Sequence, residues 1–201
     1  MPKDTFNNLS AEKKRIIFDA AVQEFSTRRF SEASINQIIK TAGISRGSFY
    51  QYFNDKEDIY LYMIMEIGKE KLEVLSHTEA LNPDADFFEN FLHMTRVALT
   101  WAKTKPDYNQ VGLLMELDDS EFIAKLRALS TEGLAIIKGM VERDKQRGLI
   151  RQEINSDLVV EMMYTLNINL LKDIYRNGSE EEMLKKMADM YDIIKGGIAR
   201  V

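Results

Sequence analysis

The sequence predicts an all-α protein with a small N-terminal domain and a larger helical C-terminal domain. Apolar residues recur with the 3.6-residue period of a helix, and no stretch alternates apolar and polar residues as a strand would. Hydrophobic residues make up 45% of the 201 positions and only 3 are proline, so we expect long helices around a substantial core. Helix-capping residues also precede most of the periodic segments.

The composition excludes several classes of site. The chain has 0 cysteines, so it has no disulfides and no thiolate metal ligands. Its 2 histidines, His77 and His93, fall on different expected helices, and we expect no metal site and no cofactor. The opening stretch MPKDTFNNLS lacks the apolar run of a signal peptide, and no segment is long enough to cross a bilayer. We therefore expect a cytoplasmic protein without membrane attachment.

The charge is unevenly distributed along the chain. Residues 1–56 hold 9 lysines and arginines against 6 acidic residues, which leaves 18 basic and 26 acidic residues for the remainder. A slightly basic N-terminal segment followed by an acidic remainder favours two separate functions, although a charge asymmetry of this size also arises by chance.

The first two expected helices lie near the N-terminus. Residues 11–25 carry a mostly apolar stripe, and Ser10 is the candidate N-cap. The second helix starts at Ser34, with Gln37 three positions later as the partner in a capping box. It ends at Gly43, which can adopt the left-handed conformation that closes a helix.

The third expected helix, residues 45–53, completes a helix-turn-helix whose last helix enters the DNA major groove. Phe49 and Phe53 are four positions apart and should face the core. Gly47 and Gln51 point the opposite way. A glycine there costs roughly 1 kcal/mol of helix stability relative to alanine, a cost that makes sense if the backbone must approach DNA closely.

The outward face of this helix carries side chains suited to DNA. Arg46 can read guanine and Gln51 can read adenine through paired hydrogen bonds. Tyr50 and Tyr52, at the rim, can donate to phosphate oxygens, and Lys56 can do the same from the first turn of the next helix. The candidate DNA contacts are Ser34, Gln37, Ser45, Arg46, Gly47, Ser48, Tyr50, Gln51, Tyr52 and Lys56.

Residues 10–60 resemble the N-terminal domain of TetR/AcrR-type transcriptional regulators, through AAVQEF followed by SINQIIKTAGISRGSFYQYFNDKEDIY. The resemblance implies a DNA-binding domain at 1–56 and an effector-binding and dimerisation domain at 57–201. It also implies a non-enzymatic, ligand-responsive regulator, and favours a repressor. Such a homodimer binds a palindromic operator in double-stranded DNA and is released by a small apolar effector. The alternative is a DNA-independent helical adaptor of the same fold that acts through protein contacts, and an α-helical enzyme is a third, weaker alternative.

The remaining expected helices span about residues 55–75, 85–105, a short stretch after Pro106, 120–148, 156–177 and 179–196. The acidic run MELDDSE, between two of them, is interpreted as a solvated turn. Methionine and aromatic residues along these helices suit an adaptable apolar pocket, although an ordinary core explains any one of them as well. The candidate effector contacts are Met63, Phe87, Phe91, Trp101, Tyr108, Met115, Phe122, Met140 and Met163.

The last two expected helices are apolar on more sides than a helix exposed to water would be. Two such helices from each chain can form a symmetric four-helix bundle. In that bundle, Asn167 and Asn169 would be polar residues that set the register between the two chains. The sequence identifies neither the effector nor the operator.

Overall fold

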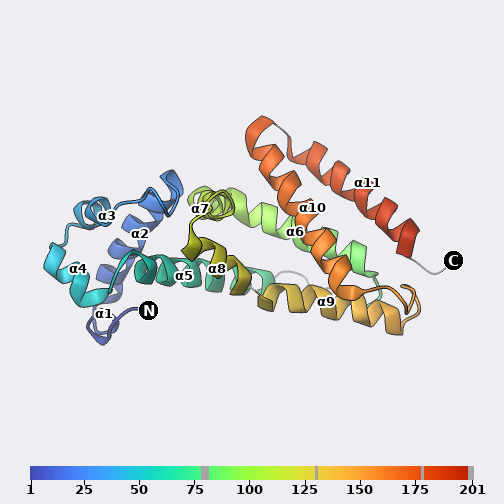
Figure 1. Cartoon of the computed structure of the whole chain (residues 1–201), viewed down its shortest axis with the longest axis horizontal. Helices are drawn as coiled ribbons and strands as arrows, with labels where there is room; N and C mark the ends of the chain where they lie inside the picture. The colour runs from blue at the N-terminus through green and yellow to red at the C-terminus, as the bar shows by residue number, and fades with distance from the viewer. Residues whose placement is uncertain (78–81, 130, 178, 199–201) are drawn as a thin grey trace. The chain divides into compact units, whose positions relative to one another are not determined.

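A computed structural model describes residues 1–77, 82–129, 131–177 and 179–198, and within these residues the chain forms eleven helices and no strand (Figure 1). The all-α prediction is confirmed. The helices are α1 Asp4–Asn7, α2 Ala11–Thr27, α3 Ile35–Ala42, α4 Arg46–Tyr52, α5 Lys56–His77, α6 Phe87–Thr104, α7 Pro106–Glu116, α8 Glu121–Leu129, α9 Thr131–Gln146, α10 Ser156–Asn177 and α11 Glu180–Ile198.

Two elements differ from expectation. The short helix α1 was not predicted, because only one apolar side chain, Phe6, marks it in a polar stretch. Where one helix over 120–148 was expected, the structure has α8 and α9, and residue 130 between them lies outside the described residues.

Local capping explains most of the helix starts. The Ser10 hydroxyl accepts a bond from the Lys13 amide at 3.3 Å, and the Asp55 carboxylate accepts one from the Asp58 amide at 2.9 Å. The capping box expected at Ser34 is wrong, because the Ser34 side chain makes no cap bond.

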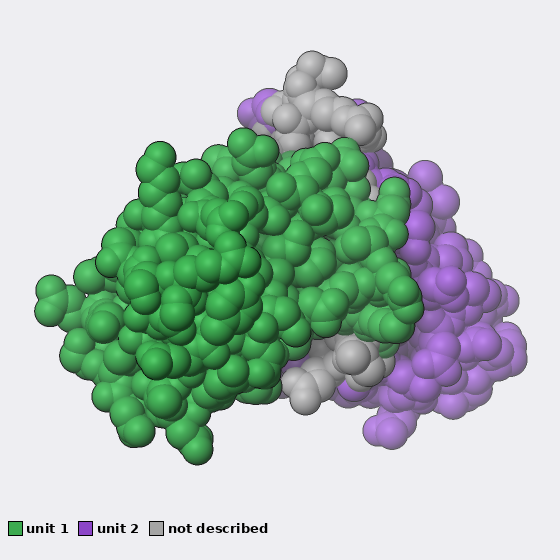
Figure 2. Space-filling view, turned by 60° about the vertical axis from the view of Figure 1, so that its left-hand side comes forward, with its two compact units in different colours: residues 1–76, 100–128 green, residues 77–99, 129–201 purple. Residues whose placement is uncertain are grey.

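The chain divides into two compact units, coloured separately in Figure 2. The first unit comprises residues 1–76 and 100–128, and the second comprises residues 77–99 and 129–201. The first unit therefore contains not only the helix-turn-helix, α2 to α4, but also α7 and the greater part of α5 and α8.

The core of the first unit is rich in aromatic rings. α2 is its centre, since both α3 and α7 pack along it. Phe25 and Tyr60 meet edge to face with ring centroids 4.8 Å apart, and Phe30 lies 4.6 Å from Phe122. These contacts join the helix-turn-helix to α5 and α8 in one apolar cluster.

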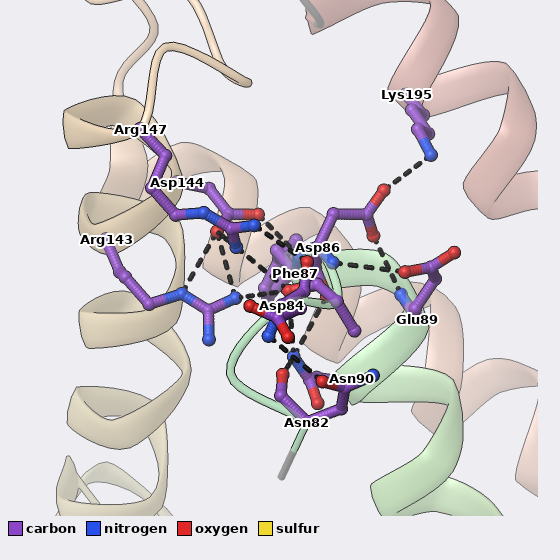
Figure 3. Close-up of polar contacts among 11 residues, drawn as sticks. Asn82, Asp84, Asp86, Phe87, Glu89, Asn90, Arg143, Asp144, Arg147 and Lys195 are labelled. Carbon is purple, nitrogen blue, oxygen red and sulfur yellow. Dashed lines mark hydrogen bonds and ion pairs between the residues drawn. The ribbon is translucent and has the colours of Figure 1, made fainter.

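The second unit packs the N-terminal part of α6 with α9, α10 and α11. Figure 3 shows how polar contacts hold the start of α6. Asp144, 1% exposed, accepts the Phe87 amide at 2.5 Å and pairs with Arg143 and Arg147 at 2.9 and 3.2 Å. The carboxylate caps α6 and is paired with two arginines, and these contacts offset the cost of burying its charge.

Candidate nucleic-acid interface

The last helix of the helix-turn-helix, α4, begins and is anchored as the sequence predicts. Gly43 ends α3 with φ of 64°, the left-handed conformation that glycine adopts without strain. The Ser45 hydroxyl then caps α4 by accepting the Ser48 amide at 3.0 Å. Phe49 and Phe53 are fully buried, so one face of α4 is held on the core.

The opposite face of α4 is exposed and polar. Its exposed residues, here called the exposed face of α4, are Ser45, Arg46, Gly47, Tyr50 and Gln51, while Ser48 is half-buried. Arg46 is already oriented there, since its guanidinium donates to the Asn36 side chain at 3.1 Å and lies 5.7 Å from the centre of the Tyr50 ring. A Cβ at Gly47 would meet only the Ser45 hydroxyl oxygen, at 3.7 Å. The protein itself therefore does not require glycine at this position.

The two predicted contacts on α3 are exposed. The Ser34 amide donates to the Glu24 carboxylate at 2.8 Å, which accounts for a buried glutamate within the apolar stripe of α2. The Gln37 amide group donates to the Thr41 hydroxyl at 3.4 Å. Both side chains remain open to a partner in front of α3.

Tyr52 differs from the prediction. It was expected at the exposed rim, but it is only 7% exposed, and its ring lies 6.0 Å from that of Phe6. Because α1 covers this side of α4, Tyr52 belongs to the core and Tyr50 is the tyrosine on the exposed face.

Lys56 also has a role that the sequence did not indicate. Its ammonium group donates to the backbone carbonyls of Ser31 and Ala33 at 3.4 and 3.0 Å and lies 4.6 Å from the Phe30 ring centre. Burial lowers the pKa of Lys56, against the attraction of Asp118 and Glu24. These contacts of Lys56 hold the loop between α2 and α3, whereas the prediction had the same ammonium group donate to a DNA phosphate.

Asp118 was missed by sequence reasoning. The acidic run that contains it was interpreted as a solvated turn, but Asp118 is 0% exposed. Its carboxylate accepts the Ser31 amide at 2.8 Å, the Ser31 hydroxyl at 2.9 Å and the Ser120 amide at 2.8 Å. Burial alone raises its pKa, but the polar groups of Ser120 and Ser31 outweigh burial and bring the pKa to about 2. Asp118 thus ties the α7–α8 connection to the loop that precedes α3.

The candidate effector residues divide between the cores of the two units. Met63, Trp101, Tyr108, Met115 and Phe122 pack in or against the core of the first unit, whereas Phe87, Phe91, Met140 and Met163 belong to the core of the second. Two grooves of about 500 Å³ each lie in the first unit, and Arg15 lines both of them. Tyr108 is the one candidate that lines either of these two grooves, and the Arg15 guanidinium donates to its hydroxyl at 3.4 Å.

The helices expected to dimerise present apolar residues to solvent. Leu158 and Met162, one turn apart on α10, are 53% and 42% exposed, and Ile193 on α11 is 77% exposed. Asn167 differs from the prediction, because it is buried, donates to the Met163 carbonyl and accepts the Tyr191 hydroxyl at 2.6 Å. Its hydrogen bonds hold α10 to α11 within one chain.

Nowhere among the described residues do three side chains that could bind a metal come together. No helix in the same ranges is both long and apolar enough to cross a membrane.

Known proteins share this architecture. A family model described as bacterial regulatory proteins of the tetR family matches residues 17–63, which run from α2 to α5. An HTH-type transcriptional repressor of Mycobacterium tuberculosis is 22% identical over 210 aligned positions that cover 100% of both chains.

Solved structures agree with these matches. A TetR family transcriptional regulator from Chloroflexus aurantiacus superposes with a TM-score of 0.72 and 28% identity over 100% of both chains. FadR from Bacillus subtilis, solved in complex with stearoyl-CoA, superposes with a TM-score of 0.72 over 92% of this chain and 99% of that chain. At 19% identity, the second likeness concerns the fold alone.

Proposed function

We propose that this chain, which belongs to the TetR family of bacterial transcriptional regulators, represses transcription by binding a palindromic operator through the exposed face of α4. The observation that carries the proposal is the division of α4 into two faces. Phe49, Tyr52 and Phe53 are buried, while Arg46 and Gln51 project outward beside a glycine that no protein contact requires.

Each outward side chain has a distinct task in this proposal. Arg46 donates a pair of hydrogen bonds to guanine, and Gln51 pairs with adenine. Tyr50, Ser34 and Gln37 donate to phosphates, which fixes orientation without reading sequence. Gly47 lets the backbone of α4 approach the DNA.

A homodimer supplies the second half-site contact. The apolar residues Leu158, Met162 and Ile193 are exposed on α10 and α11, and burying them against a second copy is favourable. Two recognition helices then meet half-sites about 34–36 Å apart, one turn of DNA.

The test of DNA binding is a mobility shift on the DNA upstream of the chain's own gene, with heparin as competitor. We expect a complex that survives heparin and disappears when Arg46 and Gln51 are both replaced by alanine. A complex that heparin removes entirely would refute operator recognition and favour the hypothesis of a DNA-independent adaptor.

The effector in this proposal is a small apolar molecule. A long acyl chain is the first class to test, because the Bacillus subtilis FadR structure holds stearoyl-CoA. In this chain, the indole N–H of Trp101 is buried without a hydrogen-bond partner in the described structure, and such an unpaired donor can donate to a ligand oxygen. Tyr108, 6.1 Å away between ring centres, lines a groove in the same unit.

Effector binding can be measured by the fluorescence of Trp101, because the sequence has a single tryptophan. Linkage requires that an effector which lowers DNA affinity bind the DNA-loaded protein less tightly, by the same factor. We therefore expect stearoyl-CoA to change Trp101 fluorescence, and its apparent affinity to fall when operator DNA is added. A ligand that binds equally in both cases would not be a regulator.

A further inference from the structure

The N-terminal segment, residues 1–9, packs on the recognition helix. Its helix α1 lies against α4, and Phe6, 1% exposed, is its anchor. The Phe6 ring centre is 4.9 Å from those of both Phe53 and Tyr62 and 6.0 Å from that of Tyr52. The segment therefore belongs to the core of the first unit rather than to a free terminus.

The same segment satisfies the end of α4. The last four carbonyls of a helix have no partner within the helix, and α4 has only 7 residues. The Phe49 carbonyl accepts the Phe53 amide at 2.9 Å. The other three accept donors from the N-terminal segment: the Tyr50 carbonyl from the Lys3 ammonium at 2.8 Å, the Gln51 carbonyl from the Thr5 hydroxyl, and the Tyr52 carbonyl from the Lys3 amide at 2.9 Å.

These bonds matter because a helix of two turns is not stable by its own hydrogen bonds. The Lys3 ammonium also places a positive charge at the negative end of the helix dipole. Two of the three residues whose carbonyls receive these bonds, Tyr50 and Gln51, belong to the exposed face of α4. The hydrogen bonds from the N-terminal segment to these carbonyls therefore fix the orientation of Tyr50 and Gln51.

We propose that the N-terminal segment is a brace for DNA reading, in which Lys3 and Thr5 are positioning residues and Phe6 is the anchor. The inference rests on the proposed function, because the brace acts on a helix that reads DNA. The rival interpretation is that Lys3 itself binds a phosphate. In the structure its ammonium group is already bonded to the carbonyl of Tyr50.

The first test needs no DNA. The double variant Lys3→Met and Thr5→Val removes both side-chain donors and keeps Phe6. Hydrogen exchange of the free protein should then quicken about tenfold for the amides of residues 49–53, as expected for the loss of about one to two hydrogen bonds, and stay unchanged in α2. The matched control Lys125→Met removes an exposed ammonium group on α8 and should leave α4 unchanged.

Two results of this test would overturn the brace: unchanged exchange in α4, or equal acceleration throughout the first unit. If the double variant does not fold, the single variant Thr5→Val gives the same test at smaller amplitude. Lys3→Arg keeps a charged donor, so the double variant Lys3→Arg and Thr5→Val should exchange no faster than Thr5→Val alone.

The second test uses the DNA duplex that the wild-type chain selects from a random pool. The double variant should bind this duplex about tenfold more weakly, while its affinity for an unrelated duplex and its salt dependence stay those of the wild type. A salt slope lower by about one unit per half-site would make Lys3 a phosphate contact and overturn the proposal. If the wild type selects no DNA, the proposed function fails, and the exchange result still decides whether the brace exists.

Discussion

The substitution Asp118→Asn tests the link between the α7–α8 connection and the helix-turn-helix. The carboxylate accepts three hydrogen bonds from Ser31 and Ser120, and these hold the loop in front of α3. Asparagine keeps the size and one acceptor oxygen but removes the charge. We expect a folded variant with lower stability, because charge-assisted hydrogen bonds become neutral ones.

The magnitude follows from the pKa of Asp118. It is about 2 in the folded chain, against 3.8 for an unperturbed carboxyl group. One pKa unit corresponds to about 1.4 kcal/mol, so ionised Asp118 stabilises the fold by about 2 kcal/mol. Because the folded pKa is the lower one, this stabilisation is complete above the unfolded value and is lost as the pH falls toward 2. At pH 3 about half of it, roughly 1 kcal/mol, should remain.

The assay is urea unfolding followed by circular dichroism, at one protein concentration, for wild type and variant at pH 7 and pH 3. The stability difference between them should be about 2 kcal/mol at pH 7 and about half as large at pH 3. The control Asp119→Asn removes the same charge from an exposed neighbour and should shift stability by less than about 0.5 kcal/mol at both pH values. An Asp118→Asn difference that does not change with pH would refute the reasoning.

Four further substitutions test the interface and the dimer. Gly47→Ala should raise the free energy of unfolding by up to about 1 kcal/mol and weaken DNA binding, measured by fluorescence anisotropy. Equal or tighter DNA binding by the variant would show that the backbone does not approach DNA closely at this position. Arg46→Ala should cost about 1–3 kcal/mol of binding and relax selection at one base pair per half-site, whereas an equal loss on all sequences would identify a phosphate contact. Lys56→Met should lower the urea midpoint, because the Ser31 and Ala33 carbonyls lose their donor. It should leave the salt dependence of DNA affinity unchanged. A salt slope smaller by about one unit per half-site would instead show that the Lys56 ammonium group contacts DNA. Met162→Lys should convert a wild-type dimer of twice 23.2 kDa into monomers in light scattering, and a monomeric wild type at micromolar concentration would refute the dimer through α10 and α11.

Sequence by itself determined the features that depend on neighbours a few positions apart. The caps at Ser10, Ser45 and Asp55 each join a side chain to an amide three residues later, so the local pattern is sufficient to find them. Phe49 and Phe53 share a face because a helix repeats every 3.6 residues, and the left-handed turn at Gly43 follows from the freedom of glycine. The helix-turn-helix and most of the exposed face of α4 follow from these local rules, although they do not find that Tyr52 is buried beneath α1.

Only the tertiary structure decided which polar side chains form hydrogen bonds with distant parts of the chain and which remain exposed. Ser31 and Asp118 are 87 positions apart, Lys3 and Tyr50 are 47 apart, and Asn167 and Tyr191 are 24 apart. The local pattern around each polar residue is equally compatible with an exposed side chain. Burial of a charged or amide group becomes favourable only when a distant segment supplies its hydrogen bonds, and packing of the whole unit brings that segment into place.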